Sequence, residues 1–254
     1  MYNRQKALLY LLLQFKLRGK EISKTRLNKL LFVMKKESVI GERIKFYSFY
    51  PHKYGPFSSQ LELDIADLQS RGMLSDELLS LINEAEIHEM VSEKDRSIIG
   101  SCIDRFVGID VVSYVYSKYP EYTSRSLRVK HEKTAKTPGI FSIGYEGHDI
   151  DSFLDVLIRN GVETVVDVRF NPFSMNPVFI KQRLQAHLNR VGIGYIHMPE
   201  LGIDGRYRKD LADDKDYQRL FKFYSESILP KHMDMVCELG ELGSRKRIAL
   251  LGFV

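Results

Sequence analysis

The sequence contains no tryptophan and only two cysteines, and none of its apolar runs approaches the roughly 18 residues that a membrane span needs. Cys102 and Cys237 stand in helix-like surroundings, with no Cys-x-x-Cys motif and no histidine pair at metal-ligand spacing. We therefore predict no disulfide, no metal site and no cofactor. The N-terminal apolar stretch ends at Lys16 without a signal-peptide cleavage site, so we expect a cytoplasmic protein that does not bind a membrane.

The composition is that of a globular protein with one large domain or two ordinary ones. Of the 254 residues, 44% are hydrophobic and 28% are charged. The net charge of +5 points to an anionic partner such as nucleic acid. Many housekeeping enzymes are equally basic, so the charge alone does not decide the function.

The N-terminal half shows the periodicity of short amphipathic helices. Apolar stripes indicate helices over 8–15, 27–34 and 61–68, and more amphipathic helix over 76–116. Aromatic residues over 44–50 are typical of a strand, and 51–58 is rich in turn residues. This order predicts a mainly helical, winged-helix-like recognition domain in residues 1–120.

Residues 121–138 are expected to form a basic linker. Six cations between Lys118 and Lys136 stand against only two acidic residues. One interpretation is a solvated tether, and the other is a basic strap that contacts phosphates, so that binding falls as salt rises. The candidate nucleic-acid-binding residues are Arg125, Arg128, Lys130, Lys133 and Lys53.

Residues 139–254 alternate between strand and helix patterns. Strands are expected over 140–143, 162–168, 193–198 and 247–253, with helices around 150–158, 180–191 and 217–228 between them. Right-handed crossovers would make these strands a parallel sheet with helices on both faces. We predict an α/β, Rossmann-like domain without the dinucleotide fingerprint.

Polar residues follow the strands of this sheet, where ligands bind in such folds. Gly144 and Gly147 allow a sharp turn that pushes Glu146 out of the loop, while Asp149 and Asp151 are expected to cap the next helix. The candidate catalytic residues are Glu146, Asp167 and His197. The candidate substrate-binding residues are Tyr145, Gly147, Arg169, Asn171, Ser174, Tyr195 and Glu200.

Asp167 and Arg169 flank Val168, so both side chains point to the same face of their strand. Arg169 would hold a phosphate or carboxylate, and Asp167 would accept from a ribose hydroxyl or act as a base. The alternative is that the two pair with each other. If Glu146 and Asp167 converge, they would also suit Mg²⁺.

The strings "SIGYEG", "VVDVRFNPFS", "GIGYIHMPELG" and "RIALLGF" resemble the family called domain of unknown function 488, over Gly139 to Val254. The resemblance implies an α/β domain with a site at the strand tips. Members have a basic residue where this chain has Met175, and their last strand continues through a Cys and a Glu to a Cys-His-Arg group. Here Gly252 and Val254 occupy those places, so we expect either a truncated sequence or a member that lacks part of the site.

In the N-terminal half, "RLNKLLFVMKK" and "FYPHKYGPFSSQLELDIADLQSRGML" resemble Panacea-type antitoxin modules. This resemblance implies a winged-helix-like module that recognises DNA or a partner protein.

Together these features favour an enzyme that acts on a nucleotide or a DNA base, in DNA repair or anti-phage defence. N-glycosidic cleavage is the most concrete reaction: Glu146 or Asp167 would activate water or stabilise the oxocarbenium ion, Arg169 would hold phosphate, and Tyr195 would stack on the base. The alternative is a non-catalytic regulator that binds DNA or a protein partner and senses a ligand through its α/β domain. A phosphate-binding scaffold with neither role is a third alternative.

Overall fold

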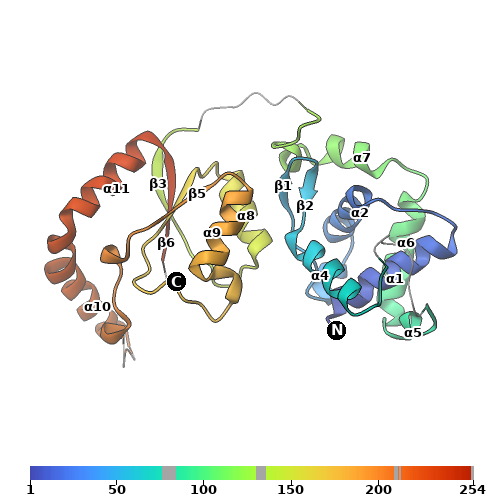
Figure 1. Cartoon of the computed structure of the whole chain (residues 1–254), viewed down its shortest axis with the longest axis horizontal. Coiled ribbons are helices and arrows are strands. Elements are labelled where there is room, and N and C mark those ends of the chain that lie inside the picture. The colour runs from blue at the N-terminus through green and yellow to red at the C-terminus, as the bar shows by residue number, and fades with distance from the viewer. Residues whose placement is uncertain (76–83, 130–135, 209–210, 212, 253–254) are drawn as a thin grey trace. The chain divides into compact units, whose positions relative to one another are not determined.

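The computed structural model describes residues 1–75, 84–129, 136–208, 211 and 213–252, and it divides the chain into two compact units (Figure 1). Unit 1 comprises Met1–Glu132 and unit 2 comprises Lys133–Val254.

Unit 1 is mainly helical, as predicted. Its helices are α1 (Asn3–Leu17), α2 (Lys24–Glu37), α3 (Ile40–Arg43), α4 (Ser59–Ser70), α5 (Glu84–Glu89), α6 (Glu93–Phe106) and α7 (Val111–Lys118). Helix α1 is buried almost all round and packs against α5 and α6, which makes it the centre of the core. Helix α4 starts at the Ser58 cap and ends before Gly72, whose φ of 67° suits glycine.

The strand predicted over 44–50 is wrong for all of its residues except Tyr50, the first residue of β1. Its aromatic residues Phe46, Tyr47 and Phe49 are buried in the helical core instead. The strands are β1 (Tyr50–His52) and β2 (Gly55–Phe57), an antiparallel hairpin in the segment predicted as loop. Aromatic residues mark burial as well as strand, and here burial against helices decided the outcome.

The first part of the predicted linker is folded against unit 1. Residues Pro120–Thr123 form a 3₁₀ turn in which Tyr122 is buried. The backbone N–H of Leu127 donates to the carbonyl oxygen of Lys53 at 2.9 Å, which joins this segment to the hairpin. Unit 1 therefore extends beyond the predicted boundary at residue 120.

Unit 2 is built on a four-stranded parallel sheet, which confirms the predicted α/β class. The strands are β3 (Gly139–Ile143), β4 (Thr164–Asp167), β5 (Gly194–His197) and β6 (Arg247–Leu251), in the order β3-β6-β4-β5. The helices α8 (Ile150–Arg159) and α9 (Lys181–Arg190) cover one face, and α11 (Met233–Arg245) covers the other (Figure 1). All four strands therefore end at one edge of the sheet.

The long helix predicted over 217–228 is shorter and is followed by a second helix. Helix α10 (Asp214–Phe223) gives way to a π-helical turn over Tyr224–Ile228 and a 3₁₀ turn over Leu229–His232. Pro230 has no N–H to continue the helical ladder, so the chain restarts as α11. At Gly243 of α11 a Cβ would lie 2.4 Å from Cγ1 of Ile140, so the glycine permits close packing on β3.

Candidate functional site

The polar groups at the strand ends of unit 2 separate into a buried network and two pockets. What we call the buried charge network consists of the buried Asp167 and Arg169 and the half-buried Tyr195, His197 and Lys181. The Glu146 pocket and the Glu200 pocket are named after the acidic residues predicted for the site. Glu146 and Glu200 line separate pockets, whereas Asp167, Arg169 and His197 belong to the network.

Asp167 and Arg169 form a bidentate ion pair inside unit 2. Arg169 donates from Nε to Oδ1 at 2.8 Å and from Nη2 to Oδ2 at 2.6 Å. The side chain of Arg169 is 2% exposed and that of Asp167 is 0% exposed. The hydroxyl of Tyr195 donates to Oδ2 at 2.6 Å. Burial and this bond to Asp167 raise the pKa of Tyr195 far above its usual value. The mutual pairing left open by the sequence is thus the observed arrangement.

His197 links this network to α9. Its Nε2 lies 2.9 Å from the carbonyl oxygen of Arg169, and its Nδ1 lies 3.1 Å from Nζ of Lys181. A carbonyl only accepts, so Nε2 carries the proton and Nδ1 accepts from the lysine. His197 is therefore a neutral connector between the end of β4 and α9.

An aromatic pair lies beside the ion pair. The ring of Tyr145 stacks on Phe179 at 4.8 Å, and Cζ of Arg169 lies 5.3 Å from the centre of the Tyr145 ring. Arg169 also donates from Nη2 to the carbonyl oxygen of Phe179 at 3.0 Å. With both partners buried, Arg169 does not present a phosphate-binding fork and Asp167 does not present a base to solvent. Their predicted roles as ligand contacts stay predictions.

The Glu146 pocket lies at the carboxyl ends of β3, β6 and β4. It has a volume of about 670 Å³ and is lined by Ser142, Ile143, Gly144, Glu146, His148, Val168, Leu250 and Gly252. Glu146 is exposed, and Gly147 has a φ of 73°, a backbone conformation that glycine adopts without strain. The prediction of a site at the tip of the first strand thus coincides with a real cavity.

His148 is a residue of this pocket that the sequence reasoning missed. Its Nδ1 lies 3.1 Å from Oγ of Ser152, whose hydroxyl donates to the carbonyl oxygen of Asp149 at 3.0 Å. Because that hydroxyl hydrogen is used, we assign the proton to Nδ1, which leaves the Nε2 lone pair without a partner among the described residues. Asp149 caps α8 through the N–H of Ser152 at 2.8 Å, as predicted.

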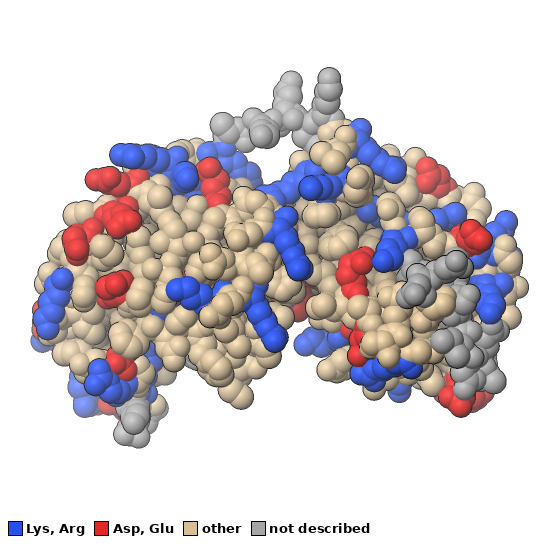
Figure 2. All heavy atoms as spheres, viewed as in Figure 1, with Lys and Arg blue, Asp and Glu red and all other residues tan. Residues whose placement is uncertain are grey.

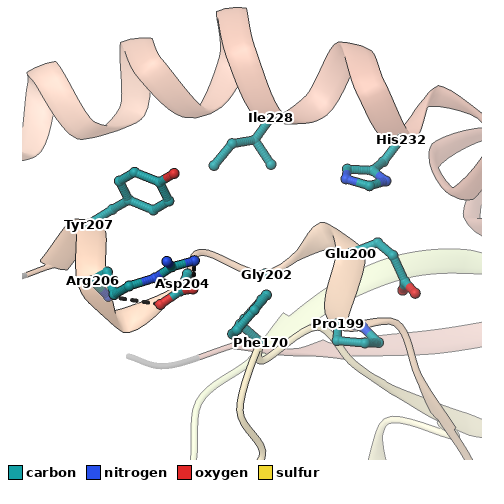
Figure 3. Close-up of a pocket in the computed structure, with 9 residues that line it drawn as sticks. All are labelled: Phe170, Pro199, Glu200, Gly202, Asp204, Arg206, Tyr207, Ile228 and His232. Atoms are coloured by element: carbon teal, nitrogen blue, oxygen red, sulfur yellow. Dashed lines mark hydrogen bonds and ion pairs between the residues drawn. The ribbon is translucent and has the colours of Figure 1, made fainter.

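The Glu200 pocket is smaller, at about 300 Å³ (Figure 3). Figure 3 shows Phe170 on one side of it and Tyr207, Ile228 and His232 around the other. At its floor, a Cβ added to Gly202 would lie 2.3 Å from the backbone nitrogen of Phe170, so this glycine allows the loop after β5 to pack on the end of β4. The remaining lining residues are Pro199, Glu200, Asp204 and Arg206.

One comparison with known proteins gives a result. Residues 149–254 match the family model of DUF488, a domain of unknown function. The predicted resemblance is confirmed for this part of the chain. The matched DUF488 region contains the buried charge network and the Glu200 pocket, while Glu146 and His148 stand just before it. No curated protein and no solved structure matches the chain significantly. The resemblance of unit 1 to Panacea-type modules stays a prediction.

The other predicted residues of the DUF488 region lie outside both pockets. Asn171 is exposed, and Ser174 is buried in a turn where its Oγ accepts from the N–H of Asn176 at 3.1 Å. A Mg²⁺ site shared by Glu146 and Asp167 does not fit, because Asp167 is held by Arg169 while Glu146 lines its pocket. Within the described ranges, no cluster of three or more metal-ligating side chains occurs, and no helix could cross a bilayer.

Three of the predicted nucleic-acid contacts, Lys53, Arg125 and Arg128, are described residues of unit 1. Lys53 and Arg128 are exposed and Arg125 is half-buried, while Lys130 and Lys133 lie outside the described residues. Figure 2 shows Lys and Arg side chains spread over both units on the visible face, with acidic side chains between them. On this face, basic side chains are therefore visible on both units.

Proposed function

We propose that the chain is a nucleic-acid-associated hydrolase that acts on a nucleotide or DNA base at the Glu146 pocket. The observation that supports this is a cavity of about 670 Å³ at the carboxyl edge of a parallel sheet, lined by Glu146 and His148. Ligand pockets are typically roughly 300 to 1,000 Å³, and in open α/β sheets they occur at this edge. Cytoplasmic DNA repair or anti-phage defence remains the expected setting.

N-glycosidic cleavage is the reaction that these two side chains suit best. The oxygen of a water molecule bonds to the anomeric carbon as the bond from that carbon to the base nitrogen breaks. Nε2 of His148 takes the proton of the water and returns it to the leaving base, while the Glu146 carboxylate stabilises positive charge on the sugar. The buried charge network fixes the end of β4, which contributes Val168 to the cavity wall.

A non-catalytic regulator is the second candidate, and one observation favours it. Most glycosidases use two carboxyl groups at the scissile bond, whereas Glu146 is the single carboxylate among the described residues that line its pocket. In that case the pocket would sense a ligand. Unit 1 would act in either candidate as a winged-helix-like module that recognises DNA or a protein partner.

Release of free base distinguishes the two candidates. We would incubate the full chain with nucleosides, nucleotides and DNA containing normal or modified bases, and measure free base and abasic sites. Glu146→Gln and His148→Asn should each reduce the rate by about 10²-fold or more. Glu241→Gln, a change of the same chemistry at an exposed helix position, is the matched control.

Equal rates in Glu146→Gln and the control would remove Glu146 from catalysis. A nucleoside that raises the melting temperature without any product, and does so less in His148→Asn, would instead support the ligand-sensing candidate.

A further inference from the structure

Unit 1 contains a buried lysine that is not neutralised by an acid. Lys29 on α2 is 2% exposed, and its Nζ donates to the carbonyl oxygen of Pro56 at 3.1 Å. An ammonium group has three donors, and burying its charge is costly unless a counter-charge is close. Among the described residues, Lys29 forms no ion pair with a carboxylate.

The groups around Lys29 are further cations. Arg128 acts on it electrostatically, and burial together with that charge lowers the pKa of Lys29 to about 8. Burial and the charges of Lys53, Lys29 and Arg125 likewise lower the pKa of His52. Lys29 and His52 thus both lie beside other basic residues, which come from the hairpin turn and from the segment after α7.

The backbone holds these residues in one place. The bond from Leu127 to Lys53 joins the segment after α7 to the hairpin turn. Within that segment the N–H of Arg128 donates to Oγ of Ser126 at 3.1 Å, and this hydroxyl also bonds to Tyr116 at 2.5 Å. The like charges are therefore fixed together by the fold and do not merely meet by the motion of long side chains.

Three other cations of unit 1 have acidic partners. Arg4 pairs with Asp64 at 2.7 Å, and Glu37 receives Arg105 at 2.8 Å and Lys118 at 3.0 Å. Lys29 has no such partner among the described residues, and a buried charge of this kind is destabilising unless an anion supplies the missing charge.

We propose that the β1–β2 hairpin and residues 125–128 form a binding site for the phosphate groups of a nucleic-acid backbone. Lys53 and Arg128 contact phosphate from the surface, and the buried charge of Lys29 strengthens the site from beneath. Tyr54, which is 50% exposed beside Lys53, offers a ring for a base to stack on, which favours nucleic acid over free phosphate. The inference rests on the nucleic-acid partner of the proposed function and not on its catalysis.

The test uses the full chain with Glu146→Gln throughout, so that loss of binding and loss of catalysis are separate results. Binding of fluorescent single-stranded and duplex DNA is measured by anisotropy across a salt series. Lys53→Gln with Arg128→Gln should weaken binding at least tenfold and reduce the slope of log K against log salt by about two. Lys20→Gln with Lys45→Gln removes the same charge from exposed positions elsewhere in unit 1 and should change binding less than twofold.

Lys29→Met should also weaken DNA binding, although it removes no exposed contact. Unchanged affinity in this variant would remove Lys29 from the site. Equal losses in the site and control double variants would show attraction by net charge only and overturn the proposal. If a polyglutamate peptide displaces the fluorescent DNA as strongly as unlabelled DNA does, the cluster binds an acidic protein partner instead. If inorganic phosphate alone displaces the DNA at low concentration, the cluster is a site for small anions only.

Discussion

Replacing Lys29 with methionine should make unit 1 more stable at neutral pH and change how its stability depends on pH. Methionine keeps the length of the side chain and removes the charge. The pKa of Lys29 falls from 10.5 to about 8 in the folded chain because of burial and the neighbouring Arg128. Since the folded state gives up this proton more readily, the unfolded state holds more protons between about pH 8 and 10.5, and the free energy of unfolding rises with pH there.

The expected size follows from this shift. A difference of 2.5 pH units at about 1.4 kcal/mol per unit gives a total of about 3.4 kcal/mol, of which about 2.5 kcal/mol is gained between pH 7 and pH 10. The parent chain should gain this stability relative to Lys29→Met over that range. Other lysines and tyrosines titrate in both proteins, so their contributions cancel in the comparison.

The assay is urea unfolding of the full chain and of Lys29→Met at pH 7, 8, 9 and 10, with the transition of unit 1 followed separately from that of unit 2. A difference in unfolding free energy that stays constant with pH would show that Lys29 is not a buried, unneutralised charge. Saturating DNA should reduce the difference at pH 7, because a bound phosphate compensates the charge.

Three further changes test other parts of the structure. Asp167→Asn leaves Arg169 buried without its partner and should lower the unfolding free energy of unit 2 by about 3–5 kcal/mol, whereas a loss below about 1 kcal/mol would show that the pair is solvated. Gly202→Ala drives a Cβ into the backbone after β4 and should destabilise unit 2 by about 1–3 kcal/mol. Gly205→Ala, whose Cβ would meet no atom within 4 Å, should have little effect, and equal melting temperatures of the two variants would contradict the close approach at Gly202. Burial raises the pKa of Glu37, but hydrogen bonds from two tyrosines and a lysine outweigh burial and hold that pKa below its usual value, so the stability that Glu37 gives is lost as pH falls through its folded pKa. Glu37→Gln should therefore weaken the loss of unfolding free energy of unit 1 at acid pH, and an unchanged acid dependence would refute this.

The parallel sheet could be predicted because its strands are short apolar runs between helical stripes. Helix α11 was missed, since Gly240 and Gly243 interrupt its pattern and its helical character comes from packing on β3 and β6. In unit 1 the run over 44–50 has the composition of a strand, but its aromatic residues pack among helices. A single sequence does not reveal which neighbours cover a residue.

The site shows the same limit. Period two correctly placed Asp167 and Arg169 on one face, but it does not tell whether that face is open, and Phe179 and Tyr145 lie against it. A single histidine in a turn does not by itself indicate a functional role, so the sequence did not single out His148. The spacing of Glu146 and His148 about Gly147 was the clue that could have found the pair.

The most direct measurement is a crystal structure of the full chain with Glu146→Gln soaked in a nucleoside. We expect the nucleoside in the Glu146 pocket, with its sugar within about 3 Å of residue 146 and of Nε2 of His148. A nucleoside bound in the Glu200 pocket alone, with the Glu146 pocket empty, would contradict the proposed active site.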